Sequence, residues 1–328
     1  MTRPFVSRRI ALAAAALALC AASLPAMAQK YPDRAVKFVV PFAPGGAIDV
    51  MTRPIAEAMG RELGQTIVVE NKAGAAGNIG AAQVAKSPAD GYTLLVGTSA
   101  THGANPALFA NLGYDAVADF EPIMLFGGVP NILVVQAEKG AKTLTEIIQR
   151  AKARPDALTY GSAGAGTSLH LAGVLFEQSA GVKLVHVPYK GGAPASVDLM
   201  GGQIDMMFDT VAVSLPHIRS GKLRPIAVAA AERHFALPDV PTFAELGVKG
   251  VEASTWAGLF APKGTPAPAL AALRDAADKA MKDPRVQEVL RNNGYQIMAW
   301  PGQRFGDFVA SETARWGKVV KDAGIQPQ

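Results

Sequence analysis

The stretch VKFVVPFAPGGAIDVMTRPIAEAMGREL, from Val36 to Leu63, decides the fold of this chain. It predicts a buried β-strand that ends at Pro41 and an amphipathic helix that begins near Ile48. Between them, Gly45 and Gly46 leave backbone N–H groups uncovered at a helix N-terminus, where aligned peptide dipoles place roughly half a positive charge. The segment therefore predicts an anion site. No Lys follows Gly46, so the elbow lacks the nucleotide-loop pattern G-x-x-x-x-G-K-[ST] and is expected to hold a small anion through backbone groups.

The first 28 residues have the pattern of an export signal. Arg3, Arg8 and Arg9 form a basic start, Ile10–Ala22 is an apolar run, and A-x-A at its end predicts cleavage after Ala28. The run is too short to span a membrane. We therefore expect a periplasmic protein. Adjacent arginines leave twin-arginine export open beside the favoured general secretory route.

Removal of the signal changes the chemistry expected of the mature chain. The single cysteine, Cys20, leaves with it, as do three arginines, so the formal net charge falls from +5 to +2. Lipidation at Cys20 is disfavoured, because the bulky Leu19 precedes it and a good cleavage site follows. With no basic face carrying interleaved aromatics, no nucleic-acid partner is expected. No later stretch approaches the length of a membrane span, and we expect a soluble monomer.

The rest of the chain alternates strand-like and helix-like runs, which favours an α/β fold with largely parallel sheets and two domains. Two segments, Leu125–Asn131 and Gly247–Pro262, are expected to cross between the domains. One lobe would then combine residues 29–128 with 252–328, and the other would hold 129–251. The predicted strands are Val36–Val40, Thr66–Glu70, Thr93–Val96, Ile132–Gln136, Leu158–Tyr160, Leu184–Val187, Ile204–Phe208, Leu223–Ala227 and a late strand at Gly294–Ile297. The predicted helices are Ile48–Leu63, Asn78–Lys86, Leu144–Ala153, Ser168–Gln178, Pro194–Met200, Pro268–Lys282 and Pro301–Lys321.

A second glycine-rich elbow, LTYGSAGAGTSLH, lies at residues 158–170. A short strand leads into its glycines, and a helix begins near Thr167. Two readings stay open: Thr167 or Ser168 caps its own helix and the glycines only form a turn, or the loop faces the first elbow across a cleft. In the second case, both elbows would hold one acidic ligand.

Three further polar positions are candidates for ligand contact. Thr98 and Ser99 follow a strand, at the end where open α/β sheets bind ligands, although an ordinary turn is equally compatible. Asp209 ends another strand and either accepts from a ligand hydroxyl or amine, or caps the helix that begins near Val211. Asp49 lies in the first turn of the first helix, where a structural role is favoured, either with the helix dipole or in holding the Gly45–Gly46 loop.

Catalytic and metal-binding patterns are not found. Neither Ser99 nor Ser162 has the flanking glycines of a nucleophile elbow. The five histidines lie at least 16 residues apart, and the mature chain has no cysteine, so we predict no metal and no cofactor. The dinucleotide fingerprint also fails, because Leu169 stands where its third glycine would be. A hydrolase that uses Ser162 or Ser168 with His170 remains the alternative.

Several motifs together resemble one family. These are PFAPGGAIDVMTR (41–53), VENKAGAAGNIGA (69–81), GYTLLVGTSATH (91–102), YGSAGAGTSLHLAG (160–173), VPYKGGAPASVDLMGGQIDMMFD (187–209) and WAGLFAPKGTP (256–266). In order and spacing they resemble the tripartite tricarboxylate transporter receptors, the Bug family of secreted solute-binding proteins. The resemblance implies a type-II periplasmic binding protein fold, with two α/β lobes, two crossing segments and a ligand cleft between the lobes. It also implies small carboxylate ligands, whether dicarboxylates, amino acids or aromatic acids.

The resemblance further implies where the ligand lies. One ligand carboxylate would be held by Ala43–Ala47 and Ser162–Ser168, through backbone amides and bridging water, while Thr98, Ser99 and Asp209 would line the cleft. Asp209 favours a ligand with a hydroxyl or amine, or with only one carboxylate. We therefore predict a binding protein rather than an enzyme, which passes its ligand to membrane transporter subunits; a sensory receptor is the other alternative. The predicted ligand-binding residues are Phe42, Ala43, Gly45, Gly46, Ala47, Asp49, Thr98, Ser99, Ser162, Gly164, Gly166, Thr167, Ser168 and Asp209.

Overall fold

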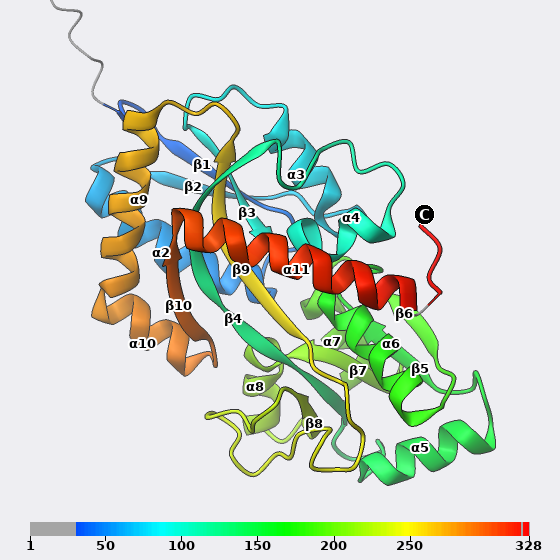
Figure 1. Ribbon diagram of the computed structural model, residues 1–328. Coiled ribbons are helices and arrows are strands. Elements are labelled where there is room, and N and C mark those ends of the chain that lie inside the picture. Colours follow the sequence, from blue (N-terminus) through cyan, green and yellow to red (C-terminus); the bar gives the residue numbers. More distant parts are fainter. Residues whose placement is uncertain (1–30, 323, 328) are drawn as a thin grey trace, which may run out of the picture.

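The computed structural model describes residues 31–322 and 324–327, and it is a mixed α/β structure (Figure 1). Its strands are β1 (Val36–Val40), β2 (Ile67–Asn71), β3 (Thr93–Thr98), β4 (Phe120–Gln136), β5 (Thr159–Ser162), β6 (Val185–Pro188), β7 (Met206–Thr210), β8 (Leu223–Ala229), β9 (Ser254–Pro262) and β10 (Gln296–Pro301). Its helices are α2 (Ala47–Leu63), α3 (Asn78–Ala85), α4 (Asn105–Leu108), α5 (Leu144–Ala153), α6 (Ser168–Ala180), α7 (Gly192–Met200), α8 (Val211–Arg219), α9 (Ala267–Lys282), α10 (Pro284–Asn292) and α11 (Gly302–Asp322). Short helical turns at Ala75–Gly77 and Ala100–Ala104 precede α3 and α4.

Strand β4 belongs to two sheets. Along Phe120–Pro130 it pairs antiparallel with β9, in a sheet that continues through β3, β1 and β2 and takes β10 on its other edge. From Asn131 to Gln136 it pairs instead with β7 and β8, and β7 leads on to the parallel strands β5 and β6. In Figure 1, β4 and β9 run side by side through the length of the molecule.

Helix α11 crosses these two long strands and packs on the hydrophobic clusters of both sheets (Figure 1). Its Phe305 and Val309 join the hydrophobic cluster around β3 and β9, whereas Trp316 and Val320 join the cluster around β5, β7 and α6. The Glu312 carboxylate accepts hydrogen bonds from two buried indoles, which fixes α11 against β9. The packing of the C-terminal helix α11 therefore stabilises both sheets.

Most of the predicted elements are confirmed within two residues. β1 and α5 match their predicted bounds, and the elbow between β1 and α2 lies where the sequence places it. The late strand is β10, and the final helix begins one residue after its predicted start. Helix α10 was not predicted, although Asp283 caps it and Pro284 occupies its first position, which is a recognisable helix start.

The predicted crossing segment Leu125–Asn131 lies inside the 17-residue strand β4, which passes from one sheet to the other at Asn131. Its glycines serve close packing rather than interruption. A Cβ on Gly127 would overlap the Gln296 carbonyl oxygen of β10, and a Cβ on Gly258 of β9 would overlap the Phe305 ring. Glycine in these strands is thus the residue that lets β10 and α11 approach the sheet.

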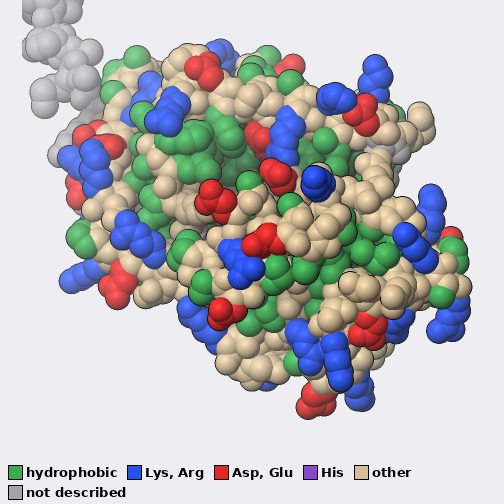
Figure 2. All heavy atoms as spheres, turned by 60° about the horizontal axis from the view of Figure 1, so that its bottom comes forward, with side chains coloured by type: hydrophobic (Ala, Val, Ile, Leu, Met, Phe, Trp, Pro, Cys, Tyr) green, Lys and Arg blue, Asp and Glu red, His purple; other side chains and the backbone are tan. Residues whose placement is uncertain are grey.

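The distribution of charge on the surface in Figure 2 is relevant to whether nucleic acid is a partner. On that face, Lys and Arg side chains alternate with Asp and Glu side chains, and apolar side chains gather in a hollow between them. The face shown has no continuous basic stripe. Within the described residues, no helix is both long and apolar enough to cross a membrane. The predicted export signal, residues 1–28, lies outside the part of the chain that the structure describes.

Candidate functional site

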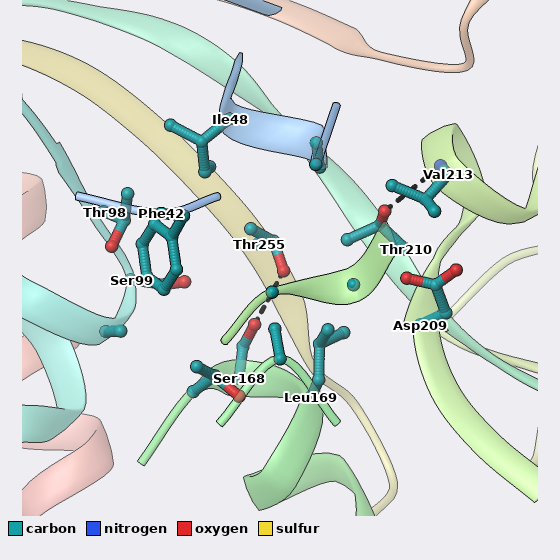
Figure 3. Close-up of a pocket in the computed structure, with 17 residues that line it drawn as sticks. Phe42, Ile48, Thr98, Ser99, Ser168, Leu169, Asp209, Thr210, Val213 and Thr255 are labelled. Carbon is teal, nitrogen blue, oxygen red and sulfur yellow. Dashed lines mark hydrogen bonds between the residues drawn. The ribbon is translucent and has the colours of Figure 1, made fainter. Parts of the chain in front are cut away.

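A cavity lies where the two sheets meet and the ends of several helices converge (Figure 3). It encloses about 460 Å³ not occupied by atoms, part of it open to solvent. Asp209 is the one charged side chain among the described residues that line it, and the rest of the wall is made by seven apolar residues, six serines or threonines and three glycines. The lining residues are Phe42, Gly46, Ala47, Ile48, Thr98, Ser99, Ala100, Ala163, Thr167, Ser168, Leu169, Gly191, Gly192, Asp209, Thr210, Val213 and Thr255.

The first elbow is held in shape by Asp49. Gly45 adopts a left-handed conformation, with φ at +76°, and donates its N–H to the Asp49 carboxylate at 3.0 Å. Arg53 binds both oxygens of that carboxylate, at 3.0 and 2.8 Å. Asn71 donates to Asp49 and to the Phe42 carbonyl, which ties the elbow to β2. The predicted structural role of Asp49 is confirmed.

Asp49 also stays ionised in this environment. Burial alone would raise the pKa of its carboxyl, but hydrogen bonds from Arg53, the Gly45 N–H and Asn71 hold the pKa below its usual value. The charge of this carboxylate is therefore balanced by Arg53 and the loop N–H, and Asp49 does not line the cavity. The N-terminus of α2, capped by Gly46 without a side-chain hydrogen bond, is left facing the ligand space.

Four helix N-termini contribute residues to the cavity wall, counted over the described chain: those of α2, α6, α7 and α8. Thr167 caps α6 and accepts the His170 N–H at 3.3 Å, so the capping reading of this threonine is confirmed. Thr210 caps α8 in the same way through the Val213 N–H. Helix N-termini that face a cavity give it positive potential without any cationic side chain.

Ser168 connects the cavity to the crossing strands. Its Oγ lies 2.7 Å from Oγ1 of Thr255 on β9, and Thr255 donates to Oδ1 of Asn131 on β4 at 3.0 Å. Because a hydroxyl carries one hydrogen, Ser168 must donate to Thr255, which leaves the Ser168 oxygen free to accept. Asn131 stands where β4 changes sheets. A ligand that contacts Thr255 is therefore one hydrogen bond from Asn131 at this junction, and a ligand that contacts Ser168 is two hydrogen bonds from it.

Asp209 is fully buried at the end of β7. Its Oδ2 accepts from Ser214 at 2.7 Å and from Ser196 at 3.4 Å, whereas its Oδ1 has no hydrogen-bond partner among the described residues. Burial raises the pKa of Asp209 to about 6, against the opposing effect of the hydrogen bonds from Ser214 and Ser196. The helix cap is Thr210 rather than Asp209, so that alternative for Asp209 is wrong.

The second elbow lies only partly on the cavity. Ser162 is buried away from it, with its Oγ 2.7 Å from Nε2 of His186. Gly164 and Gly166 have φ of +131° and +86°, and they shape the loop without lining the cavity. Gly166 also lies close to Asn105, because a Cβ there would stand 3.0 Å from the asparagine oxygen.

The structure brings together eight of the fourteen predicted residues: Phe42, Gly46, Ala47, Thr98, Ser99, Thr167, Ser168 and Asp209. The remaining six are not among the residues that line the cavity: Ala43, Gly45, Asp49, Ser162, Gly164 and Gly166. Nine lining residues were not predicted: Ile48, Ala100, Ala163, Leu169, Gly191, Gly192, Thr210, Val213 and Thr255. A signal existed for Gly191 and Gly192, which form a third glycine pair directly before a helix, and for Thr255, a polar residue in a predicted crossing segment.

The residues proposed for a hydrolase do not meet. Ser162 pairs with His186, Ser168 pairs with Thr255, and Nδ1 of His170 accepts the Gly166 N–H at 3.2 Å. Burial lowers the pKa of His170 to about 4 and that of His186 to about 3. Across residues 31–322 and 324–327, no group of three or more His, Asp or Glu side chains is placed to hold a metal ion.

Comparison with known proteins places the chain in a family. Residues 51–325 match the family model described as the tripartite tricarboxylate transporter family receptor. The chain is similar to the periplasmic binding protein BugD, with a TM-score of 0.87 and 37% identity over 91% of this chain and 100% of that one. It is also similar to Rpa4515 of R. palustris, solved with adipate, at 38% identity and a TM-score of 0.85 over 91% and 100% of the two chains.

A third solved structure is MatC from Rhodopseudomonas palustris with bound malate, at 37% identity and a TM-score of 0.84 over 88% of this chain and 100% of that one. These likenesses confirm the predicted periplasmic-binding-protein fold. The family match covers most of the chain and begins at residue 51, after the first elbow; it includes the second elbow, Asp209 and both crossing segments. The chain belongs to the tripartite tricarboxylate transporter receptor family, whose members include the Bug solute-binding proteins.

Proposed function

We propose that this chain is a periplasmic receptor that binds a small organic carboxylate in the cavity and passes it to a membrane transporter. One observation carries the proposal: the N-termini of α2 and α6 meet at a cavity that has no Lys, Arg or His among its described lining residues. Such a site offers oriented N–H donors and dipole charge to one anionic group. A carboxylate needs no more than this, whereas a polyphosphate calls for cations.

The ligands of two similar structures support the carboxylate class. Rpa4515 was solved with adipate and MatC with malate. In this chain the carboxylate would accept from backbone N–H groups at Gly46–Ile48 and from the first turn of α6 at Ser168–Leu169. Phe42 and Ile48 would cover the apolar part of the ligand (Figure 3).

Binding would close two lobes around the ligand. We assign residues 29–128 and 252–328 to one lobe and 129–251 to the other, joined by β4 and β9. The elbow of the first lobe and the loop before α7 already touch, because a Cβ on Gly191 would stand 3.2 Å from the Cβ of Ala43. A ligand that bonds to both sides favours this closed arrangement over an open one.

The proposal includes export by the N-terminal signal, with cleavage after Ala28, and a binding role without turnover. The family supports both parts, since it is a receptor family with periplasmic members. The burial of Ser162, and its hydrogen bond to His186 rather than to His170, also speak against the proposed hydrolytic pair.

The test is isothermal titration calorimetry of the mature protein, unfolded and refolded to remove any ligand carried through purification. Small mono- and dicarboxylates are titrated, with their methyl esters or amides as controls. Binding of the acids and loss of binding by the neutral derivatives would support the proposal. Equal binding of acids and neutral derivatives, or release of hydrolysis products from the esters, would contradict it.

A further inference from the structure

Two parts of the cavity wall differ in charge. The first part, here called the carboxylate end, is lined by the N-termini of α2 and α6, and neither helix contributes an acidic side chain to the described lining residues. The second part, here called the far end, is lined by the N-termini of α7 and α8 together with the carboxylate of Asp209. Asp209 accepts from Ser196 of α7 and Ser214 of α8 and directly precedes the capping residue of α8.

One oxygen of that carboxylate remains available. Both serine hydroxyls donate to Oδ2, so Oδ1 is buried with no partner among the described residues. Gly192 allows this oxygen to pack closely against the first residue of α7, because a Cβ there would stand only 2.9 Å from Oδ1. A buried carboxylate oxygen without a donor is destabilising, and a ligand hydrogen-bond donor placed there would remove that penalty.

A second ligand carboxylate is poorly matched to this end. It would meet the Asp209 charge at short range in a space of low polarity, where like charges repel strongly. No described cationic side chain lines the cavity to offset that repulsion. The dipoles of α7 and α8 do not supply the offset either, because they already act on Asp209 itself.

We infer that the ligand of this site carries one carboxylate at one end and a hydrogen-bond donor, a hydroxyl or an ammonium group, at the other, and that Oδ1 of Asp209 accepts from this donor. The inference rests on the proposed function, since it takes carboxylate binding at α2 and α6 as given. It separates this chain from the two similar structures solved with the dicarboxylates adipate and malate. A hydroxyl or ammonium donor would satisfy the same oxygen, and the experiment below distinguishes them.

The experiment compares acids that differ only at the far end. Calorimetry at pH 7.5 uses butyrate, 4-hydroxybutyrate, 4-aminobutyrate and glutarate, and repeats with pentanoate, 5-hydroxypentanoate, 5-aminopentanoate and adipate. We expect at least one donor-bearing acid to bind about tenfold or more tightly than both the unsubstituted acid and the diacid of its series. Preference for the amino over the hydroxy acid would identify an ammonium ligand, and the reverse a hydroxyl ligand.

Asp209→Asn is the diagnostic variant, with Asp205→Asn as the matched control, because the exposed Asp205 bonds to Thr159 outside the cavity. The Asp209 variant should lose the donor preference, and the Asp205 variant should keep it. Tighter binding of glutarate or adipate than of the donor-bearing acids would overturn the inference and leave the proposed function standing. So would diacid binding that strengthens below pH 6, since Asp209 would then be the donor. If none of these acids binds, both the inference and the proposed function fail.

Discussion

The substitution Asp209→Asn should make the ligand-free protein more stable at neutral pH. Burial raises the pKa of Asp209 from 3.8 to about 6, so ionisation at pH 7.5 is disfavoured in the folded state. Two pKa units correspond to about 3 kcal/mol of folding free energy. Asparagine carries no charge and can still accept from Ser214 and Ser196 through its oxygen. Its buried amide hydrogens return part of the gain, so we expect a net increase of about 1–2 kcal/mol in the free energy of unfolding.

The sign of the pH dependence follows from the direction of the shift. An acid whose folded-state pKa is raised destabilises the fold above that pKa, and the penalty disappears as the pH falls through about 6 towards 3.8. The advantage of Asp209→Asn should therefore be present at pH 7.5 and nearly absent at pH 4.5. Tyr295, which interacts electrostatically with Asp209, does not titrate in this window, because burial raises its pKa further from neutrality.

The assay is urea unfolding at 25 °C of refolded, ligand-free wild type and variant, at pH 7.5 and 4.5. The quantity compared is the difference between the two proteins, since the histidines titrate alike in both. For a chain of this size the expected gain at pH 7.5 corresponds to a shift of roughly 2–6 °C in Tm. Equal or lower stability of the variant at pH 7.5, with Asp205→Asn unchanged, would refute the account of Asp209 as a strained, unpartnered carboxylate.

Three further results are expected. Gly46→Val should fold, because Gly46 has a φ of −76° and its added Cβ would meet only the Ala43 oxygen at 3.5 Å. The valine should cover the α2 N-terminus and weaken carboxylate binding about tenfold or more in calorimetry, whereas the control Gly317→Val, on α11, should not. Thr255→Val should lower the free energy of unfolding by about 1–3 kcal/mol and should also weaken ligand binding. Thr265→Val, which removes a buried hydrogen bond to Pro262 outside the cavity, should lower stability alone. Ligand affinities that fall equally in the two variants would contradict the role of Thr255. Wild-type stability should decline as the pH falls from about 6.5 to 4. Burial lowers the pKa of His102 to about 3, so over this range the unfolded chain binds a proton that the folded chain does not. Unfolding curves that coincide at pH 7 and 4.5 would exclude this.

The elbow could be predicted because its signals are local. A run of buried residues, two glycines and an amphipathic helix follow one another within 28 residues, and β1 and α2 form where that pattern places them. The same holds for α6, whose capping threonine is readable from its neighbours. Local pattern also located the segment that becomes β9, since a strand that crosses between sheets is still an extended run.

The wall of the cavity could be predicted only in part, because it depends on which way a side chain points. Ser162 and Ser168 look alike in the sequence, yet the partner of Ser162 is His186, 24 residues away, and that of Ser168 is Thr255, 87 residues away. No motif contains those pairings. Gly127 and Gly258 are likewise explained only by distant parts of the chain, because β10 and α11 supply the atoms that a Cβ at these positions would meet.

The same limit explains why the two ends of the cavity differ in how far the sequence defines them. The carboxylate end is made by backbone N–H groups, which any sequence that builds the elbow and the helix must supply, so it belongs to the fold. The far end depends on a single carboxylate whose two oxygens have different partners: Oδ2 is bonded to two serines and Oδ1 to no described residue. Only the second oxygen is available to select a ligand, and its isolation weakens the ligand-free protein. A buried carboxylate oxygen left without a donor beside the cavity is the arrangement expected of a position kept for binding rather than for stability. The stability gained by Asp209→Asn and the ligand preference lost with it should therefore appear in the same variant.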